Sequence, residues 1–532
     1  MTARIRCSSI SPRSLKRLTA LAPTLACALG LSLLTVTTAS AAPAAPTVTA
    51  ATAAETSVDL TWSLPPVTAK KMVSVSPGSS STCAIDDAGA TWCVGGNNYG
   101  QLGNGTTGGS SSVFSSAVTA QTFSTIESGS SFTCALNTAG SPYCWGLQSD
   151  GKLGIAAATG PTGVISAVDG GHSFTRLSNL EDHTCALTAA GAAYCWGDGD
   201  DGRLGDGSFG RNLSPGLVSG GNTFNRIAAG ERHSCAIDTA NDAWCWGMRG
   251  RGVLGVGGAL SGNETTPVAV SGGLKFTEID TGGVNTCALT AAGAAYCWGA
   301  NNNGELGSGS TSVSDSGVPV AVAGSHTFTQ ITLGDRHVCA LDTAGAAWCW
   351  GMGTRVGNGT TDINTDFNVP TQVSGGHVFK SINASMGGTC AIDNSDRIWC
   401  WGAGIKGALD TGTSIEYVPT RLLDPGDPDD YQVETSTNGT TWTTATASTG
   451  GPELTYSVTG LTAGTAYYFR VTGSSGGTLG TASAAYGPVT TTSPTPTAPP
   501  TPVPMLPLGG LLGVGLLVAG LGGRRLRQAW RR

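Results

Sequence analysis

The 532-residue sequence has little charge and few aromatic side chains. Only 12% of its residues are Asp, Glu, Lys or Arg, 6% are Phe, Trp or Tyr, and six are histidines. Neither the His-Glu-x-x-His pattern of zinc proteases nor a phosphate-binding loop is present. These absences argue against zinc-dependent proteolysis and nucleotide-dependent catalysis. Glycine is abundant, and the cysteines are regularly spaced.

The first forty residues are typical of an export signal. Five basic residues within 4–17 precede an apolar run over about 18–34, and the small residues Ala-Ser-Ala follow at 39–41. We expect cleavage after Ala41, which exports the rest of the chain. The alternative is an uncleaved N-terminal anchor.

The C-terminal end has the features of a membrane anchor. A Thr/Pro-rich tract at 491–504 is typical of a semi-extended spacer, and the apolar residues 506–522 are followed by five arginines within 524–532. This arrangement resembles the exosortase-type C-terminal sorting signals of bacterial surface proteins, although Val503-Pro504-Met505 stands where that family carries Pro-Glu-Pro. The resemblance implies surface attachment, with release after sorting as a further possibility, and a plain tail anchor is the alternative.

The charge of the exported part disfavours nucleic acid as a partner. The two ends contain ten of the 28 basic residues and none of the 35 acidic ones, which leaves 18 basic residues and a net charge of −17. Binding to DNA or RNA depends on basic side chains that neutralise phosphates. We therefore expect no nucleic-acid partner.

Cysteines reveal an internal repeat. Fourteen of the sixteen form seven pairs with one internal spacing, and the pairs follow one another at intervals of 50 to 52 residues. The two remaining cysteines, Cys7 and Cys27, lie in the expected signal peptide. The pairs are Cys83 with Cys93, Cys134 with Cys144, Cys185 with Cys195, Cys235 with Cys245, Cys287 with Cys297, Cys339 with Cys349, and Cys390 with Cys400.

Each pair spans a predicted β-hairpin. In the unit that begins at Cys287, a turn containing Gly293 separates two short strands. If the cysteines face each other, Ala288 pairs with Tyr296, and a disulfide can form because opposed Cβ atoms lie about 4.5–5.5 Å apart. Metal binding by Cys-x9-Cys is the weaker alternative, since no second pair or histidine cluster completes a site nearby.

Four short strands per repeat, seven times over, favour the blades of a β-propeller. A Phe-x-x-Ile/Leu segment precedes the hairpin in most units, and a linker strand, such as 369–373, leads into each later unit. The first unit has no room for such a strand. We therefore expect residues 418–422, after the last unit, to complete the first blade and latch the ring.

The units, with their Cys-Ala-Leu, Cys-Trp-Gly and Gly-x-Leu-Gly segments, resemble repeats of the regulator of chromosome condensation family in its secreted bacterial form. The resemblance covers residues 72–423, and Trp-Gly occurs in six of the seven copies, with Val94-Gly95 as the departure. It implies a seven-bladed β-propeller. Guanine-nucleotide exchange, the activity of the nuclear members, is not expected in an exported, disulfide-bonded and acidic chain.

The segments that flank the repeats resemble two parts of one fibronectin type III domain. Residues 46–50 and 57–62 have the pattern of its first two strands, with Trp62 as a core residue, and residues 431–489 have the pattern of the remaining strands. Leu461 and Tyr467 are placed as in a tyrosine corner. We expect the propeller to interrupt this β-sandwich; the alternative is that 43–66 is an unpaired linker.

The sequence thus predicts an all-β protein with a C-terminal transmembrane helix. The expected parts are a signal peptide (1–41), the first two strands of the fibronectin-like domain (43–66), the propeller (67–424), the remaining strands of that domain (425–490), a Thr/Pro-rich linker (491–505), and a transmembrane segment with an Arg-rich cytoplasmic tail (506–532).

No catalytic residue, metal or cofactor is expected. The histidines fall on two repeat positions, which is typical of scaffold residues, the Gly-x-Ser-x-Gly match at 473–477 lacks the strand–turn–helix setting of a nucleophile elbow, and the acidic turn at 198–202 lacks the final Glu of a calcium loop. The histidines are His183, His233 and His337 at one position and His172, His326 and His377 at the other.

We expect a non-enzymatic surface protein that binds an unknown protein or glycan or has a structural role. Alternatives are a secreted enzyme inhibitor, since secreted propeller inhibitors of β-lactamases have the same repeats, and a polysaccharide-active enzyme. Binding is expected at turn residues that vary between copies, namely Arg203, Arg249, Arg251, Asn301, Asn302, Asn303, Glu305 and Arg355.

Overall fold

The computed structural model describes residues 45–63, 70–258, 261–310, 314–403, 415–422, 427–428, 430–449, 455–475 and 478–493. The expected signal peptide, the expected transmembrane segment and most of the Thr/Pro-rich linker lie outside these ranges. Among the described residues, no helix is both long and apolar enough to cross a membrane.

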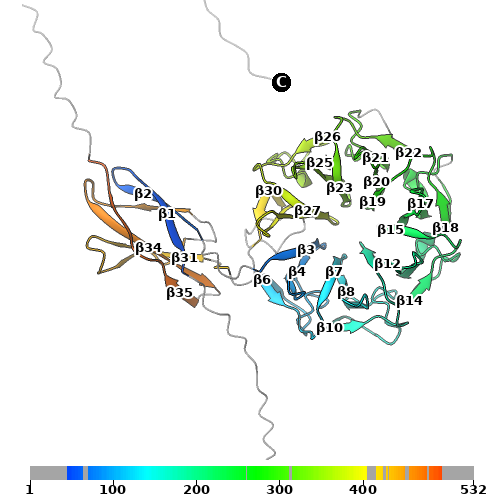
Figure 1. Cartoon of the computed structure of the whole chain (residues 1–532), viewed down its shortest axis with the longest axis horizontal. Helices are drawn as coiled ribbons and strands as arrows, with labels where there is room; N and C mark the ends of the chain where they lie inside the picture. Colours follow the sequence, from blue (N-terminus) through cyan, green and yellow to red (C-terminus); the bar gives the residue numbers. More distant parts are fainter. Residues whose placement is uncertain are drawn as a thin grey trace, which may run out of the picture. The chain divides into compact units, whose positions relative to one another are not determined.

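Seven four-stranded antiparallel sheets form a ring of blades (Figure 1). The first four blades, from the innermost to the outermost strand, contain β3 (Met72–Pro77), β4 (Ser81–Asp86), β5 (Thr91–Gly96) and β6 (Ser110–Ser116); β7 (Phe123–Ser128), β8 (Phe132–Asn137), β9 (Pro142–Gly146) and β10 (Thr162–Ala167); β11 (Arg176–Asn179), β12 (His183–Leu187), β13 (Ala193–Gly197) and β14 (Asn212–Leu217); and β15 (Phe224–Ala229), β16 (His233–Asp238), β17 (Ala243–Met248) and β18 (Asn263–Ala269).

The last three blades contain β19 (Glu278–Thr281), β20 (Asn285–Leu289), β21 (Ala295–Gly299) and β22 (Ser316–Ala321); β23 (Phe328–Leu333), β24 (His337–Asp342), β25 (Ala347–Met352) and β26 (Asp366–Gln372); and β27 (Phe379–Ala384), β28 (Gly388–Asp393), β29 (Ile398–Ala403) and β30 (Ile415–Arg421). Short 3-10 turns η1 (Asp200–Gly202), η2 (Gly250–Gly252) and η3 (Gly353–Arg355) follow the third strand in blades three, four and six.

The predicted hairpin register is confirmed. Cys287 lies opposite Cys297 and Ala288 opposite Tyr296, and the same pairing of cysteines recurs in the other six blades. Gly293 closes the turn with a φ of 77°, a backbone conformation that costs a non-glycine residue energy. Repetition of one short hairpin therefore sets the central two strands of every blade.

The predicted latch is wrong. Strand β30, which contains Val418, pairs with β29 in the seventh blade, and the first blade is completed by its own β6. The segment around Val369 likewise belongs to the sixth blade rather than to the one that follows it. No strand is exchanged among the described blades, because each third strand continues through a long turn into an outer strand of the same blade.

The ring closes by side-chain packing between its first and last blades. Met72, Val75 and Val94 of the first blade share one buried cluster with Ile392 and Ile398 of the seventh. Comparable clusters join the other neighbouring blades. Burial of apolar surface between sheets thus replaces the hydrogen-bonded latch as the source of closure.

In blades two, three, four and six, a tryptophan and a glycine join the blade to the one before it. The indole N–H of Trp246 donates a 2.9 Å hydrogen bond to the backbone oxygen of Arg203 in the preceding blade, and Trp145, Trp196 and Trp350 make the equivalent bond. A Cβ atom on Gly205 would lie 2.6 Å from Nε1 of Trp246. The Gly-x-Leu-Gly segment therefore leaves room for the indole of the next blade.

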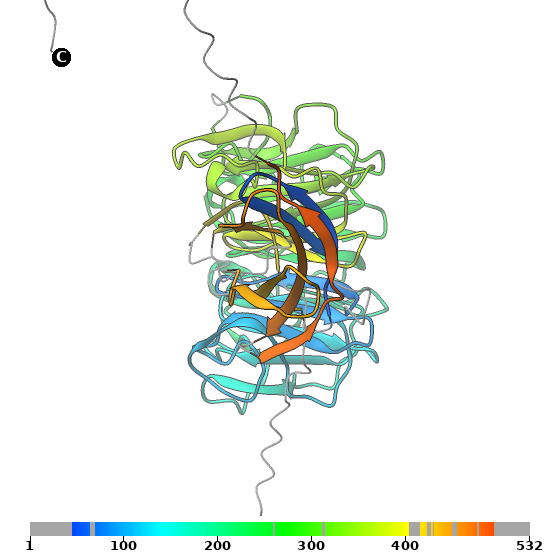
Figure 2. The same ribbon diagram turned by 90° about the vertical axis from the view of Figure 1, so that its left-hand side faces the viewer.

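The remaining strands form a second β unit from both ends of the chain. One sheet has the order β1 (Thr47–Ala53), β2 (Ser57–Ser63) and β33 (Thr455–Thr459). The other contains β32 (Thr443–Thr446), β31 (Asp430–Ser436), β34 (Ala466–Ser475) and β35 (Thr478–Ala482), and β36 (Tyr486–Thr490) also pairs with β34. Strands coloured blue and orange accordingly lie side by side in Figures 1 and 2.

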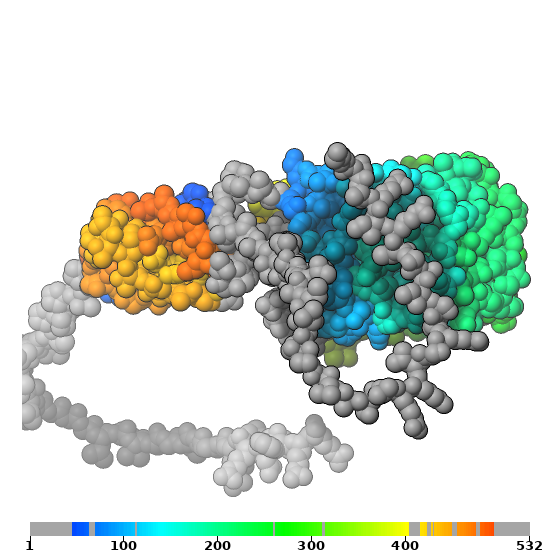
Figure 3. All heavy atoms as spheres, turned by 90° about the horizontal axis from the view of Figure 1, so that it is seen from below, coloured from blue at the N-terminus to red at the C-terminus, as the bar shows by residue number. Residues whose placement is uncertain are grey.

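The two ends of the chain share one core in this unit. Val58 lies opposite Val458 across the β2–β33 pair, and Trp62 packs edge-on against Tyr431 with 5.1 Å between ring centroids. In Figure 3, dark-blue atoms of the N-terminal strands border the orange atoms of the C-terminal ones. Residues 45–63 are therefore not an unpaired linker, and the repeats are inserted between strands of a single folded unit.

Candidate interaction face and central cavity

All fourteen cysteines of the repeats are paired as the spacing predicted. Each of the seven disulfides joins the second and third strands of one blade, with Cα atoms 4.1–4.2 Å apart. In chain order, the disulfides join Cys83 to Cys93, Cys134 to Cys144, Cys185 to Cys195, Cys235 to Cys245, Cys287 to Cys297, Cys339 to Cys349, and Cys390 to Cys400.

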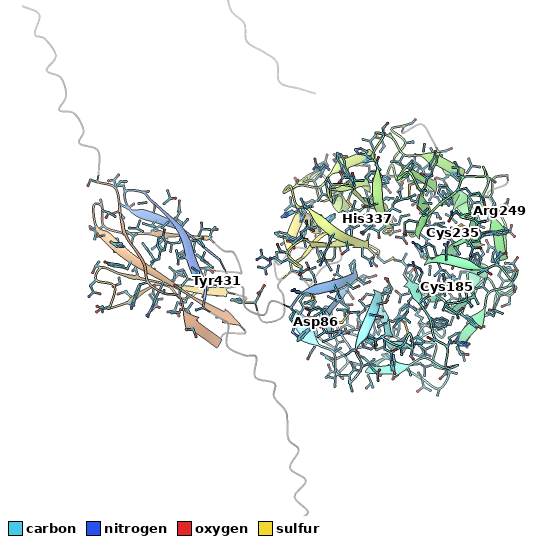
Figure 4. The ribbon with its side chains drawn as sticks, in the orientation of Figure 1. Asp86, Cys185, Cys235, Arg249, His337 and Tyr431 are labelled. Carbon is cyan, nitrogen blue, oxygen red and sulfur yellow. A yellow bond between two sulfur atoms is a disulfide. The ribbon has the colours of Figure 1, made fainter. Side chains whose placement is uncertain are left out.

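These disulfides are structural. All of the paired cysteines are fully buried, and Figure 4 places Cys185 and Cys235 inside their blades. A thiol reagent therefore has no access to them in the folded ring. The alternative prediction, a metal site built from Cys-x9-Cys, is wrong, because both sulfur atoms of each pair are used in the covalent bond.

Three of the histidines are buried and connect neighbouring blades. His183, His233 and His337 are no more than 1% exposed, and each Nε2 atom lies 2.7–2.8 Å from a Ser or Thr hydroxyl of the next blade. Burial, reinforced by the charge of Arg203, lowers the pKa of His233 to about 3. His233 is therefore neutral near pH 7, as expected for a scaffold residue.

The other three histidines pack on aromatic rings at the start of their blades. The His377 ring lies tilted against Trp399 with 4.0 Å between ring centroids, and His326 and His172 lie in the same way against Trp348 and Tyr194. Each of these three histidines therefore packs against an aromatic side chain of its own blade.

One face of the ring contains the long connections of the blades. The first and third strands of a blade run in the same direction, so the connections that follow them lie on the same face, which we call the loop face. The predicted binding turns belong to this face, because each follows the third strand of its blade.

Most of the predicted binding residues hold the loop face together. Arg251 makes a bidentate ion pair with Asp315 of the next blade at 3.0 and 3.1 Å, and Asn303 donates to Asp366 of the next blade at 3.0 Å. Arg249, in the outer part of blade four (Figure 4), pairs with Glu264 at 2.9 Å. These side chains connect turns to neighbouring strands.

Several of the predicted binding residues are buried and therefore not accessible to a partner. Arg203 is 4% exposed and donates to the backbone oxygens of Asp200 and Glu231, and Arg355 donates to that of Met386 at 2.8 Å. Glu305 and Asn301 are also buried, whereas Asn302 is exposed. The residues that vary between copies were predicted to bind a partner, but most of them make contacts between blades. They vary because the polar residues at each blade junction differ.

The exposed apolar tips of these connections were not among the predicted residues. Tyr99, Phe209 and Ile363 lie between the third and fourth strands of blades one, three and six, with 39%, 58% and 62% of their surface exposed. Large apolar side chains at such positions are typical of the residues that dominate protein interfaces. A single large apolar residue in an otherwise polar turn is the sequence signal that could have found Phe209 and Ile363.

A polar cavity of about 350 Å³ occupies the centre of the ring. The second-to-last residue of each innermost strand forms one layer around it, and the last residue forms the next. The first layer is Ser76, Glu127, Ser178, Ala228, Asp280, Thr332 and Asn383, and the second is Pro77, Ser128, Asn179, Ala229, Thr281, Leu333 and Ala384.

Side chains of the first layer connect four of the seven blades to the next one. The Ser76 and Ser178 hydroxyls accept hydrogen bonds from backbone N–H groups of the following blade at 2.8 and 2.9 Å, and Asp280 and Thr332 do the same at 2.8 and 2.9 Å. This repeated contact fixes the width of the cavity.

Two carboxyl groups of the cavity are strongly perturbed. Burial, and secondarily the charge of Asp280, raises the pKa of Glu127 to about 8, although Asn383 and Ser76 donate hydrogen bonds to it. Burial also raises the pKa of Asp280 to about 6, against the effect of its hydrogen bonds from Leu333, Thr281 and Thr332. A carboxyl group held neutral near pH 7 can donate a hydrogen bond as well as accept one.

Neither a metal centre nor a calcium loop is formed by the described side chains. In the ranges that the structure describes, no three His, Cys, Asp or Glu residues are grouped so that they could hold a metal ion. Asp201 of the acidic turn pairs with Arg232 at 2.8 Å and accepts a hydrogen bond from Asn263 of the next blade. This turn therefore contributes to blade packing.

Comparison with protein families matches the repeats. Residues 190–237 and 292–341 match the regulator of chromosome condensation (RCC1) repeat, and a second description of the same repeat matches 224–252, 276–305 and 328–355. Together with the seven sheets, these matches show that the chain carries RCC1 repeats in a β-propeller-like fold.

The curated relatives are distant in sequence. The ultraviolet-B receptor UVR8 of Arabidopsis thaliana is 27% identical over 306 residues, 56% of this chain and 57% of the receptor. The human E3 ubiquitin-protein ligase HERC2 is 27% identical over 363 residues, 65% of this chain and 6% of the ligase. The chain therefore spans less than two thirds of the length of either relative.

Solved structures agree in fold. Human WBSCR16 superposes with a TM-score of 0.56 and 20% identity over 61% of this chain and 88% of that protein. Prp20p of Saccharomyces cerevisiae gives a TM-score of 0.53 and 21% identity over 63% and 87% of the two chains. At this level of identity the likeness concerns the propeller alone.

Proposed function

We propose that the protein is exported, anchored at the cell surface, and binds a protein or glycan through the loop face of its propeller, without catalytic activity of its own. The observation that carries this proposal is the network of contacts between blades on that face, such as Arg251–Asp315 and Asn303–Asp366. A face fixed before binding loses little conformational entropy when a partner docks.

The disulfides support an extracellular setting. Seven buried disulfides in one domain are typical of oxidising compartments and rare where thiols are kept reduced. The export signal and the C-terminal anchor predicted from the sequence accord with that setting. The fibronectin-like unit and the Thr/Pro-rich segment would then hold the propeller away from the membrane.

The exposed apolar tips supply contact residues. Tyr99, Phe209 and Ile363 belong to three different blades, so a partner that contacts all three must span much of the loop face. Large apolar anchors surrounded by polar residues are the usual source of affinity in protein interfaces. The polar turns between them would contribute hydrogen bonds.

A binding assay with the oxidised full-length protein tests the proposal. Immobilised protein is exposed to isolated cell-surface and secreted protein and glycan fractions, and saturable ligands are identified and titrated. We expect the triple variant Tyr99→Ser, Phe209→Ser and Ile363→Ser to weaken binding at least tenfold. The double variant Val73→Ser and Val378→Ser, which changes exposed apolar residues near the start of innermost strands, is the matched control.

Two results would contradict the proposal. Binding that survives both the triple substitution and reduction of the disulfides would not involve the folded loop face. Turnover of a fraction component by the purified protein would instead favour the polysaccharide-active enzyme.

A further inference from the structure

The described lining of the central cavity contains acidic side chains but no basic ones in its two layers. Among the described residues, its two layers contain the carboxyl groups of Glu127 and Asp280, together with Ser, Thr and Asn side chains, and no Lys, Arg or His. Hydrogen bonds from neighbouring groups stabilise both carboxyl groups, but no cationic side chain pairs with either one among the described ion pairs.

Several buried oxygens of the same cavity lack partners within the described part of the chain. The hydroxyls of Ser128, Thr281 and Ser385 and the amide oxygen of Asn179 have no hydrogen-bond partner there, although these residues are 1–7% exposed. Buried polar atoms are nearly always hydrogen-bonded, so this part of the cavity wall holds oxygens that the described residues leave unsatisfied. The Asn179 oxygen in particular can only accept.

The arrangement of charge limits where a cation can sit. One layer further along the innermost strands, Arg176 and Arg226 lie near Glu278, and Arg226 pairs with Glu278 at 3.0 Å. These guanidinium groups repel a cation at that end of the cavity. Glu127 and Asp280 lie in a layer of the lining that contains no guanidinium group.

We propose that the central cavity binds a compact organic ammonium ion between the carboxyl groups of Glu127 and Asp280. Its N–H groups would donate to the oxygens of these two carboxyl groups. This site is separate from the loop face, so it can be present whether or not that face binds a macromolecule.

An ammonium ion fits the cavity better than a directly coordinated metal ion. Calcium takes six to eight oxygen ligands, commonly with several carboxylates. The described part of the cavity is lined by three carboxyl groups from blades two and five, of which Glu278 is already paired with Arg226. No cluster of three metal-ligating residues occurs in the described ranges. A ligand of several non-hydrogen atoms can span between blades, whereas a bare ion cannot.

Calorimetric titration of the oxidised full-length protein tests this site. The probes are butane-1,4-diammonium and butylammonium, with butane-1,4-diol as the neutral analogue and calcium chloride as the metal. We expect the ammonium probes to bind with one site per chain and the diol not to bind. Glu127→Gln and Asp280→Asn should each weaken binding at least tenfold, and the double variant should abolish it.

The matched control is Asp59→Asn, which removes an exposed carboxylate of the second β unit and should leave affinity unchanged. Each variant is accepted only if its seven disulfides and its cooperative thermal transition are retained. If the cavity variants do not fold, crystals of the wild-type protein with 4-bromobenzylammonium give the answer directly, because the anomalous signal of bromine locates the ligand.

Each contrary result overturns the proposal in a defined way. The absence of binding by both ammonium probes at millimolar concentration excludes the site. Equal binding of the diol indicates a polyol pocket, and calcium binding that displaces the ammonium probes indicates a metal site. Binding unchanged in the double variant, or bromine density outside the cavity, places the ammonium ion elsewhere.

Discussion

The environment of an individual residue in this ring, including its pKa and the space around it, depends on other blades. Glu127 is a carboxyl group that burial and Asp280 keep protonated at neutral pH by raising its pKa, and Gly205 is a glycine whose missing side chain leaves room for Trp246 of the following blade. Both residues lie within the repeat, and in both cases the neighbouring blades determine the energetics.

Glu127 should make the stability of the propeller depend on pH. Its pKa is raised to about 8 in the folded protein against 4.5 for an ordinary Glu, so the unfolded chain loses this proton first. The free energy of unfolding should therefore fall as pH rises from about 4.5 to 8, by about 1.4 kcal/mol per pH unit. In Glu127→Gln that contribution disappears.

Denaturant unfolding under non-oxidising, non-reducing conditions at pH 5 and pH 8 measures the effect. Glu127→Gln should be more stable relative to wild type at pH 8 than at pH 5. Glu55→Gln, at an exposed position between β1 and β2, is the control and should follow the wild type. Parallel curves for Glu127→Gln and wild type would show that the Glu127 carboxyl is ionised in the folded ring.

Gly205 offers a direct test of packing between blades. A Cβ atom there would lie 2.6 Å from the Trp246 indole, and its φ of 70° adds strain, so Gly205→Ala should cost several kcal/mol. Gly221 has a similar φ of 67° with nothing within 4 Å of a built Cβ. Gly221→Ala should therefore cost only about 1–2 kcal/mol, and equal losses of melting temperature would refute the packing argument.

At the scale of the element, the blade is a covalently closed hairpin with an edge strand on either side. Cys235 and Cys245 lie opposite each other on β16 and β17, and β15 and β18 pair with the outer edges of that hairpin. The sequence motif therefore describes the middle of the blade well, while the outer strands vary more from copy to copy.

Removal of one disulfide should weaken the ring measurably. Replacing both cysteines, in the double variant Cys235→Ala and Cys245→Ala, frees a loop of about ten residues in the unfolded chain, which should cost about 2–3 kcal/mol in the chain-entropy model. Alanine is used because a serine would bury an unpartnered hydroxyl. A melting temperature equal to that of wild type would mean that packing alone holds this blade.

At the scale of the whole molecule, the second β unit depends on residues from both sides of the propeller. Trp62 of β2 is 1% exposed in a core formed with Tyr431 and Phe469, so Trp62→Ala should destabilise this unit by about 3–5 kcal/mol. Limited proteolysis should then cut within residues 430–490 while the seven disulfides of the propeller stay intact.

Trp442→Ala is the control within the same unit, because that ring is half-buried beside Arg470 at 4.6 Å. In addition, residues 425–490 expressed alone should remain unfolded unless residues 43–66 are supplied, since β2 pairs with β33. A folded 425–490 fragment would show that β1 and β2 are dispensable for this core.

Much of the fold was determined by the sequence alone. The cysteine spacing predicted the hairpin register and the number of blades, because opposed residues of a hairpin lie at similar distances on either side of its turn. Cys287 and Cys297, which are paired, flank the turn that contains Gly293. The resemblance of the flanks correctly predicted paired strands within residues 46–62 and within the described parts of 431–489, although the fibronectin type III relationship itself stays a prediction.

Only the tertiary structure decided how the ring closes and which side chains remain available. The Val418 segment could pair with the outer edge of the first blade or of the last one, and its local sequence is compatible with both. In the structure it pairs with β29 of the last blade. The same holds for Arg203, which is polar and variable yet 4% exposed, and for Glu127, which is one of several acidic residues along the chain until the ring brings it near Asp280. Residues of other blades determine how deeply a side chain is buried and which charges surround it. The sequence of one repeat therefore cannot predict either property.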